Sequence, residues 1–264
     1  MRLTWANFRE ERLKRGRPFV VAHRGVRHIA PENTLRSFDL ALQQGSFALE
    51  TDLHFSKDDE LILHHDPTLG RMTGRSGTVR DHTTAELTQM TTLLPDSTET
   101  GSDTILTLRE LITFTDAKTP LLLELKDPLF AQPKYAKLLI DLLKEFNLLE
   151  MSAIISFVPA LTAAVAQVSM QVPTGHITMK DPLPRRGIEL LGPVFPLLYL
   201  NPFYVKWAHS WGGVVCPLDT TPEKRMGYYL RLGVDAVLAD NPATAIAAID
   251  ALVQKKLRIS KSSK

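Results

Sequence analysis

Two carboxylates, Glu50 and Asp52, lie one residue apart in the segment 48–55, whose alternating pattern predicts a β-strand. On such a strand the side chains of Glu50, Asp52 and His54 share one face. Carboxylates this close repel each other when ionised and cost free energy when they are buried without a partner. A divalent cation would relieve both effects, since hard cations prefer carboxylate oxygens. For this segment alone, the alternative is an edge strand with a solvated acidic face.

A second charged pair, Glu124 and Lys126, interrupts the leucine-rich segment 121–126 with the same spacing. Buried glutamate and lysine are rare unless they are paired or bind a ligand. Pairing with each other is the simpler explanation. Together with the first pair, however, Glu124 supplies a third carboxylate, and the set of three could hold one Mg²⁺ or Ca²⁺ on a phosphate oxygen.

Two histidines, His23 and His65, end further predicted strands. Cleavage of a phosphate diester needs one proton removed from the nucleophile and one delivered to the leaving alcohol, and imidazoles suit both steps near neutral pH. Arg24 and Lys126 would offset the negative charge on the phosphate. Each histidine taken alone is more simply a polar residue at a strand end. The combination favours phosphodiester hydrolysis.

The elements that would position these side chains alternate between strands and helices. Strands are expected at 19–23, 48–55, 61–66, 121–126, 153–157, 174–178, 197–200, 213–217 and 236–240, and helices at 34–44, 106–114, 135–146, 159 onward, 221–232 and 242 onward. About eight core strands with helices between most of them predict a TIM (β/α)₈ barrel, with a doubly wound open sheet as the alternative. In such a barrel the active site lies at the C-terminal ends of the strands.

The periodicity fades between about residues 67 and 103, apart from a weak helical segment at 85–90. We expect an insertion on a regular barrel, within a single domain 1–264 whose core spans about 19–250. Asn33 and Asn241 are expected to cap helices, and 220–223 has the spacing of a capping box. The segment 182–196 is expected to be rich in loops.

Composition excludes several other classes of protein. Among 264 residues, 31 Lys and Arg face 29 Asp and Glu, which argues against a dedicated nucleic-acid binder. Cys216 is the single cysteine, so no internal disulfide can form and a reducing compartment is expected. Residues 1–18 lack the apolar core of a secretory signal, and no apolar run approaches the ~20 residues of a membrane span.

We therefore expect a cytoplasmic protein. The basic segment 255–261 is expected to be a frayed end, with weak contact to an anionic membrane as the alternative. The sequence gives no prediction of the oligomeric state.

The motifs resemble the glycerophosphodiester phosphodiesterase family over about residues 19–250. The resemblance rests on His23-Arg24-Gly25, Pro31-Glu32-Asn33-Thr34, Glu50-x-Asp52, His65-Asp66, Glu124-x-Lys126 and the closing segment 233–242. It implies a TIM barrel with a small insertion after the second strand. It also implies metal-dependent hydrolysis of glycerophosphodiesters, such as glycerophosphocholine or glycerophosphoethanolamine, to glycerol 3-phosphate and an alcohol. Carried over by position, the acid/base pair is His23 and His65, the metal ligands are Glu50, Asp52 and Glu124, and the phosphate contacts are Arg24 and Lys126.

The chain departs from the family pattern at Cys216-Pro217-Leu218-Asp219, where the family often has an aromatic end to its seventh strand. This loss leaves the headgroup preference open, with Trp207 or Trp211 as candidate replacements. Two other functions remain as alternatives: lysophospholipase D-type cleavage of lysophospholipids, and a non-catalytic barrel that binds a phosphorylated ligand.

Two further histidines lie next to the motifs. His64 is predicted to have a structural role, because alternation turns it away from the pocket. His54 shares the face of Glu50 and is expected either to support the site or to add a ligand.

Overall fold

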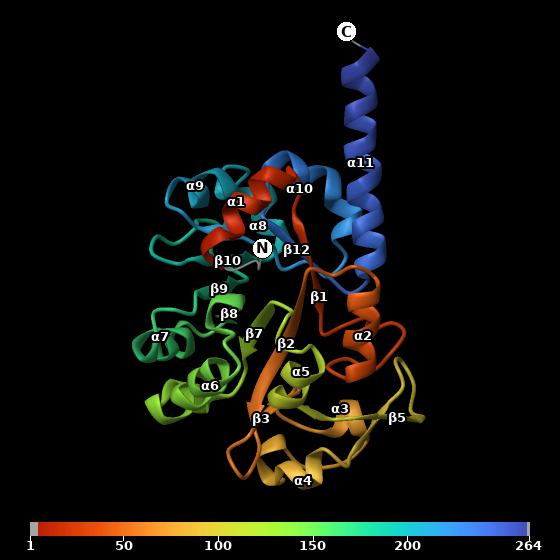
Figure 1. Ribbon diagram of the computed structural model, residues 1–264, viewed down its shortest axis with the longest axis vertical. Helices are drawn as coiled ribbons and strands as arrows, with labels where there is room; N and C mark the ends of the chain where they lie inside the picture. Colours follow the sequence, from red (N-terminus) through yellow and green to blue (C-terminus); the bar gives the residue numbers. More distant parts are fainter. Residues whose placement is uncertain (1–4, 263–264) are drawn as a thin grey trace.

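A sheet of parallel strands curls into a barrel (Figure 1). The structure is a computed structural model that describes the backbone of residues 5–262, and the side chains of that range except at 5, 6, 9 and 256–262. Within these residues the strands follow one another around the sheet in the order β11 (Val214–Val215), β10 (Leu190–Pro193), β9 (Thr174–Thr178), β8 (Ser152–Ser156), β7 (Leu121–Leu125), β2 (Ala48–Phe55), β1 (Phe19–His23) and β12 (Ala236–Ala239).

Backbone hydrogen bonds close the barrel between the two ends of this sheet. Asp235 N donates to Val215 O at 2.9 Å, and Asp240 N donates to Thr220 O at 2.9 Å. These bonds connect the segments around β12 and β11. The predicted (β/α)₈ barrel is therefore confirmed, and the doubly wound open sheet is wrong.

Alternation along the strands divides the inside of the barrel into an apolar part and a charged part. The inward positions near the N-terminal ends are apolar and pack as one cluster that includes Val21, Ala48, Leu122, Ile155, Ile177, Val214 and Leu238. Two residues further along the same strands, the inward positions become His23, Glu50 and Glu124, and Asp240 follows the end of β12 in the same way. All charge on these strands is thereby placed at their C-terminal ends.

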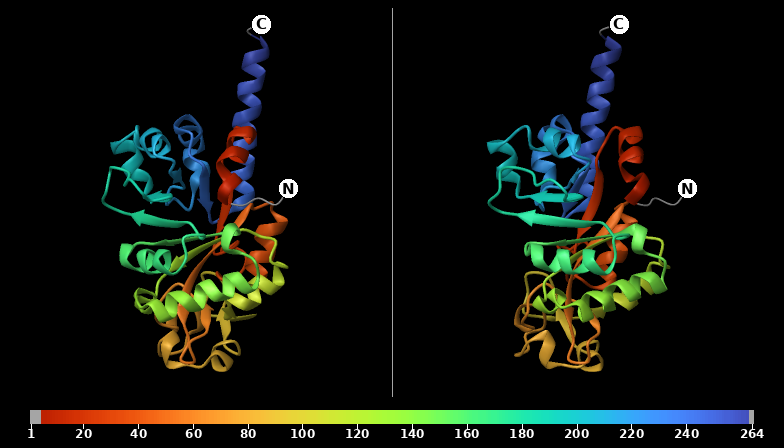
Figure 2. Two further views of the ribbon diagram at one scale, coloured as in Figure 1. Left: turned by 60° about the vertical axis from the view of Figure 1, so that its left-hand side comes forward. Right: turned by 90° about the vertical axis from the view of Figure 1, so that its left-hand side faces the viewer.

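Helices cover the outside of the barrel (Figures 1 and 2). They are α2 (Leu35–Gln43), α5 (Leu108–Phe114), α6 (Pro133–Glu145), α7 (Pro159–Val168), α8 (Phe195–Leu200), α9 (Tyr204–Ser210), α10 (Met226–Leu232) and α11 (Pro242–Ser262), with short 3₁₀ turns η2 (Pro128–Ala131), η3 (Leu149–Met151) and η4 (Pro222–Arg225). Their apolar faces pack against the outward side chains of the strands in two clusters. The segment 179–189, which connects β9 and β10, contains no helix. No helix among the described residues is long and apolar enough to cross a membrane.

Helix α1 (Trp5–Arg15), which the sequence did not lead us to expect, closes the N-terminal end of the barrel. Its Phe8 ring lies 4.8 Å from that of Phe19 and 6.1 Å from that of Phe47. Arg12 Nη2 donates to Val234 O at 3.0 Å. At the other end of the chain, α11 continues to Ser262 and projects beyond the barrel, so the expected fraying from residue 255 is wrong for the backbone (Figure 1).

The insertion follows β2, as predicted. Strand β3 (Leu61–Leu63) turns back along β2 in antiparallel pairing and also pairs with β6 (Leu106–Thr107). Between them lie α3 (Gly70–Thr73), η1 (Val79–Asp81), α4 (Thr84–Leu87), β4 (Thr91–Leu93) and β5 (Thr100–Thr104). These elements share a small apolar core of their own, made by Ile62, Leu69, Val79, Leu87, Met90 and Ile105.

Two element assignments from the sequence are wrong. The segment 197–200 is the end of helix α8, and the strand of this region lies earlier, at Leu190–Pro193. The strand is buried on both faces, so it shows no alternation, and its Gly192 and Pro193 look like a turn. Residues 106 and 107 form β6, and helix α5 begins only after Thr107, whose side chain accepts from Glu110 N.

Two predicted helix caps also differ. The N-cap of α2 is Thr34, whose Oγ1 accepts from Ser37 N at 3.3 Å, so the assignment of Asn33 is wrong. The capping box predicted at 220–223 does not form: the residue before η4 is Thr221, which makes no side-chain cap bond, and the chain enters α10 only at Met226. Asn241 does cap α11, since its Oδ1 accepts from Thr244 N at 3.2 Å.

Candidate active site

Three buried carboxylates, Glu50, Asp52 and Glu124, meet at the C-terminal ends of β2 and β7. The parallel register of these strands pairs Asp52 with Glu124, and the register of β1 with β2 pairs His23 with Glu50. One oxygen of each carboxylate lies within 4.8 Å of the others. The structure thus brings together the three residues predicted as metal ligands.

The charges in this acidic triad are not balanced by hydrogen bonds. Burial, and then the charge of Asp52, raises the pKa of Glu50 well above its usual value, and burial raises the pKa of Glu124. Burial would also raise the pKa of Asp52, but Arg24 and Lys126 outweigh it and lower that pKa. Asp52 Oδ1 is buried and, among the described residues, accepts no hydrogen bond. Three clustered carboxylates, a buried oxygen without a hydrogen bond and two glutamates with raised pKa values together fit a hard divalent cation.

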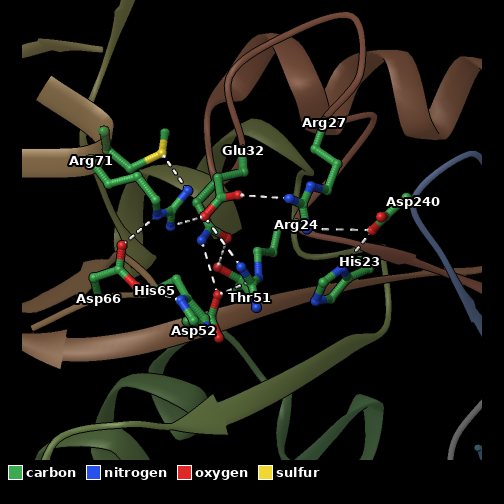
Figure 3. Close-up of polar contacts among 12 residues, drawn as sticks. His23, Arg24, Arg27, Glu32, Thr51, Asp52, His65, Asp66, Arg71 and Asp240 are labelled. Carbon is green, nitrogen blue, oxygen red and sulfur yellow. Dashed lines mark hydrogen bonds and ion pairs between the residues drawn. The ribbon is translucent and has the colours of Figure 1, made fainter. Parts of the chain in front are cut away.

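Both predicted phosphate contacts lie beside the triad, and each is paired with a carboxylate. Lys126 Nζ is 2.6 Å from Glu124 Oε1 and 3.4 Å from Asp52 Oδ1. Arg24 Nε is 3.0 Å from Asp52 Oδ2, and its Nη1 is 3.3 Å from Glu32 Oε1 (Figure 3). The two cations therefore hold the carboxylates in place in this structure, and their contact with phosphate stays a prediction.

The two predicted acid/base residues are each oriented by an aspartate (Figure 3). His23 Nδ1 is 2.6 Å from Asp240 Oδ1, and His65 Nδ1 is 2.8 Å from Asp66 Oδ1. Because an ionised carboxylate can only accept, Nδ1 carries the hydrogen in both rings. In the neutral rings, Nε2 is therefore left free to accept a proton.

Burial lowers the pKa of both histidines. For His23, hydrogen bonding to Asp240 opposes the effect of burial, and the charge of Arg24 adds to it. For His65, burial and then Arg24 lower the pKa, while Asp52 opposes them. In the substrate-free protein, burial therefore favours the neutral form of both rings. A phosphate monoanion between them would favour a proton on one ring.

Of the other two histidines of this region, His54 contacts the backbone of His65 and His64 is buried beside it in the chain. His54 Nε2 lies 3.3 Å from the carbonyl oxygen of His65, and its Nδ1 lies 3.9 Å from Asp127 Oδ2. Its ring is thus bonded to the backbone that carries His65, and it does not join the triad of possible ligands. His64 is buried, and burial followed by the nearby His54 lowers its pKa to about 4.

The sequence analysis assigned Asn33 to a helix cap, but its side chain orients the middle carboxylate of the triad. Its Nδ2 donates to Asp52 Oδ2 at 3.1 Å, and its Oδ1 accepts from Thr51 Oγ1 at 2.7 Å. The backbone of Asn33 has a φ of +57°, in the left-handed region that asparagine tolerates better than most residues. An asparagine directly after Pro31 and Glu32 was the available signal, and we interpreted it as a helix cap.

Arg71, from α3 of the insertion, was also missed. Its Nη2 lies 2.6 Å from Glu32 Oε1 and its Nε lies 2.5 Å from Asp66 Oδ2 (Figure 3). The insertion thereby holds the aspartate that orients His65. The sequence offers no signal for the contact with Glu32, because Glu32 and Arg71 are 39 residues apart.

A groove of about 900 Å³ opens beside the pair of His23 and Asp240. Its walls come from the β1–α2 connection, from α3 and from the turn between β4 and β5: Arg27, His28, Pro31, Glu32, Arg71, Met72, Leu93, Leu94, Pro95, Asp96, Ser97, Thr98 and Asp240. The insertion thus forms one side of the approach to the site.

The segment that departs from the family pattern supplies no aromatic wall. Cys216 lines an apolar cavity of about 60 Å³ at the opposite end of the barrel. Asp219 is bound by Arg225 through two contacts of 2.6 Å and by the hydroxyl of Tyr229 at 2.5 Å. Instead, Phe157 approaches the site, with its ring centroid 5.6 Å from Lys126 Nζ.

Comparison with known proteins places these features in a family context. A family model described as "Glycerophosphoryl diester phosphodiesterase family" matches residues 23–244. A glycerophosphodiester phosphodiesterase from Bacillus altitudinis is 26% identical over 238 residues, which cover 86% of this chain and 96% of the relative. Another from Caldanaerobacter subterraneus subsp. tengcongensis is 27% identical over 232 residues, with the same two coverages of 86% and 96%.

Solved structures agree with this match. A phosphodiesterase from Oleispira antarctica, in complex with the product sn-glycerol-3-phosphate, is 25% identical with a TM-score of 0.74, covering 90% of this chain and 98% of its own. A glycerophosphodiester phosphodiesterase from Agrobacterium tumefaciens has the same fold, with a TM-score of 0.73, 20% identity and coverages of 87% and 99%.

Proposed function

Since the chain belongs to the glycerophosphoryl diester phosphodiesterase family and is a phosphoric diester hydrolase, we propose that it hydrolyses glycerophosphodiesters such as glycerophosphocholine and glycerophosphoethanolamine. The products are sn-glycerol 3-phosphate and the alcohol of the headgroup. The observation that carries this proposal is an acidic triad with a histidine–aspartate pair on each side, at one end of the barrel. The Oleispira relative, which holds sn-glycerol-3-phosphate, supports the same product.

Glu50, Asp52 and Glu124 are the residues that would hold one divalent cation, Mg²⁺ or Ca²⁺. When bound, such an ion supplies Lewis acidity at a phosphoryl oxygen and neutralises developing charge. The buried Asp52 Oδ1 without a hydrogen bond and the raised pKa values of the two glutamates support this role.

His23 and His65 exchange the protons of the reaction. The free Nε2 of one ring accepts a proton from the attacking water molecule, and the other ring, as imidazolium, donates its proton to the oxygen of the leaving alcohol. Asp240 and Asp66 hold the two rings and stabilise the positive charge that each acquires in turn. Lys126 offsets the charge of the phosphate at the triad, with Arg24 beside it.

A metal-replacement assay tests this proposal. Protein stripped with EDTA is supplied with Mg²⁺, Ca²⁺ or Mn²⁺, and the release of glycerol 3-phosphate from the two diesters is followed enzymatically. We expect no release in EDTA and recovery with at least one ion. His23→Ala and His65→Ala should each lower kcat by roughly 10²–10⁴-fold without a change in the circular-dichroism melt.

His82→Ala is the matched control for these variants, because His82 lies in the insertion and bonds the backbone of Thr78. It should retain full activity. Wild-type turnover in both His23→Ala and His65→Ala would refute the acid/base assignment, and full turnover in EDTA would refute the metal.

One observation favours lysophospholipids as a second class of substrate. Phe157 stands beside Lys126, and further exposed apolar side chains follow the neighbouring strands. Comparing kcat/KM for glycerophosphocholine and lysophosphatidylcholine separates the two classes. A clear preference for the diester without an acyl chain would reject the second class. The non-catalytic barrel considered from the sequence is not supported, because the chain belongs to a family of phosphoric diester hydrolases.

A further inference from the structure

Large apolar side chains are exposed mainly on one side of the molecule. Of thirteen in the described part of the chain, ten fall between residues 157 and 211, outside the insertion and helix α1. Six of the ten follow the C-terminal ends of the neighbouring strands β8, β9 and β10, and we call them the apolar rim: Phe157, Val158, Met179, Leu183, Leu200 and Phe203. Their exposed fractions run from 39% at Phe157 to 74% at Leu200.

The apolar rim is continuous with the mouth of the candidate active site. Phe157 lies against Lys126, which pairs with the acidic triad. Asn201 Nδ2 donates to Pro182 O at 2.8 Å, so the junction of α8 and α9 is fixed to the connection between β9 and β10. In Figure 2 the arrow of β9 points to the side on which these segments lie. The rim therefore borders the same end of the barrel at which the reaction would take place.

Basic side chains are mixed with the rim. Lys180 and Lys206 are exposed, and within residues 5–262 neither forms an ion pair. The acidic groups of this region are already used, since Asp181 pairs with Arg185 at 2.5 Å and Glu189 accepts from Thr174 N at 3.0 Å. Exposed aromatic and aliphatic side chains next to free lysines are the composition of surfaces that lie in the headgroup region of anionic bilayers.

We propose that the apolar rim docks onto an anionic phospholipid membrane. The rim side chains enter the boundary between headgroups and acyl chains, and Lys180 and Lys206 contact lipid phosphates. The end of the barrel that carries the acidic triad then faces the bilayer. This inference deepens the proposed function, on which it rests, because a site held in this way can take phosphodiesters whose glycerol still bears an acyl chain.

Sedimentation with vesicles tests docking without turnover. His23→Ala protein is incubated with vesicles of phosphatidylcholine alone, or of phosphatidylcholine and phosphatidylglycerol in equal parts. We expect binding to the anionic vesicles that weakens as salt is added, and much weaker binding to the neutral ones. Adding Leu200→Ser and Phe203→Ser should lower the affinity by roughly tenfold or more, because two large apolar side chains no longer leave water.

The matched control is the double variant Leu13→Ser and Met170→Ser. These side chains are 67% and 92% exposed, but they lie on α1 and before β9, at the N-terminal end of the barrel. The control should bind vesicles like its parent. Lys180→Glu with Lys206→Glu should weaken binding to anionic vesicles and leave the weak binding to neutral vesicles unchanged.

Three outcomes would overturn the proposal: no binding to anionic vesicles, equal losses in the rim and control variants, or self-association of the free protein that only the rim variant abolishes. The rim substitutions, placed in otherwise wild-type protein, should leave the melting temperature and the hydrolysis of water-soluble glycerophosphocholine unchanged. An error in the proposed function would be recognised separately: the wild type would then not hydrolyse glycerophosphocholine, whereas vesicle binding would be unaffected.

Discussion

Replacing Asp240 by asparagine tests the role of the carboxylate behind His23. The two side chains are joined by a contact of 2.6 Å between Asp240 Oδ1 and His23 Nδ1, and the ring of His23 is buried. Asparagine keeps the size of the side chain but removes its charge. Its amide group can also rotate to present a donor to Nδ1.

The magnitude follows from what the contact supplies. A hydrogen bond to a charged group contributes about 1.5–3 kcal/mol, so its loss when His23 carries a proton corresponds to roughly 10–150-fold in rate. If the asparagine amide donates to Nδ1, the ring proton moves to Nε2 and the base is lost. The corresponding change in a serine-protease triad costs roughly 10⁴-fold. We therefore expect Asp240→Asn to lower kcat by about 10²–10⁴-fold.

The assay is the pH dependence of kcat/KM for glycerophosphocholine at saturating metal. Asp240 raises the pKa of His23 against the effect of burial, so its removal should move the acidic limb that belongs to His23 to lower pH. Asp141→Asn is the control, since Asp141 is exposed on α6 and pairs with Lys137. A kcat within about a factor of two of the wild type, with an unchanged profile, would refute the reasoning.

Three further substitutions have expected outcomes. Glu50→Gln should abolish the metal-dependent rise in melting temperature. Because burial raises the pKa of Glu50, the metal-free wild type should lose stability relative to this variant as the pH rises above the usual glutamate pKa. An equal pH dependence of the two melting temperatures would contradict this expectation. For His64→Gln the pH dependence should have the opposite sign, because burial lowers the pKa of His64 from 6.5 to about 4. Between pH 7 and pH 4, the free energy of unfolding of the wild type should fall by roughly 3 kcal/mol relative to the variant, as measured by urea unfolding in EDTA. Lys126→Met should lower kcat by roughly 10²-fold with little change in KM, and a change in KM alone would place Lys126 in substrate binding only.

The three predicted metal ligands share one property, which is their position on a strand. Glu50, Asp52 and Glu124 could be placed together because alternation fixes the face of each side chain and a barrel fixes which ends of the strands meet. For His54 the same rule left two roles open, and the residue lies on the expected face of β2 but beyond the level at which the barrel strands end. There β2 pairs with β3, and the ring reaches the backbone of His65.

Contacts between distant residues could not be predicted in this way. Asp240 lies 217 residues from His23, and Arg71 lies 39 residues from Glu32. No local pattern encodes which of many aspartates will orient a given histidine. The strand at Leu190–Pro193 was missed for a different reason, since its burial on both faces removes the alternation by which strands are recognised.

Strand β2 pairs with barrel strands along its first half and with β3 at its end, and this divides the site between the barrel and the insertion. Its first half, with Glu50 and Asp52, is paired with β1 and β7 inside the barrel, whereas its last residues pair with β3, which leads into His65 and the insertion. The insertion has its own core and supplies Arg71 and one wall of the groove. The carboxylates proposed to hold a cation thus lie on barrel strands, whereas Arg71 and one wall of the groove come from a separately packed insertion. A change within the insertion can therefore reshape the groove without moving the three carboxylates.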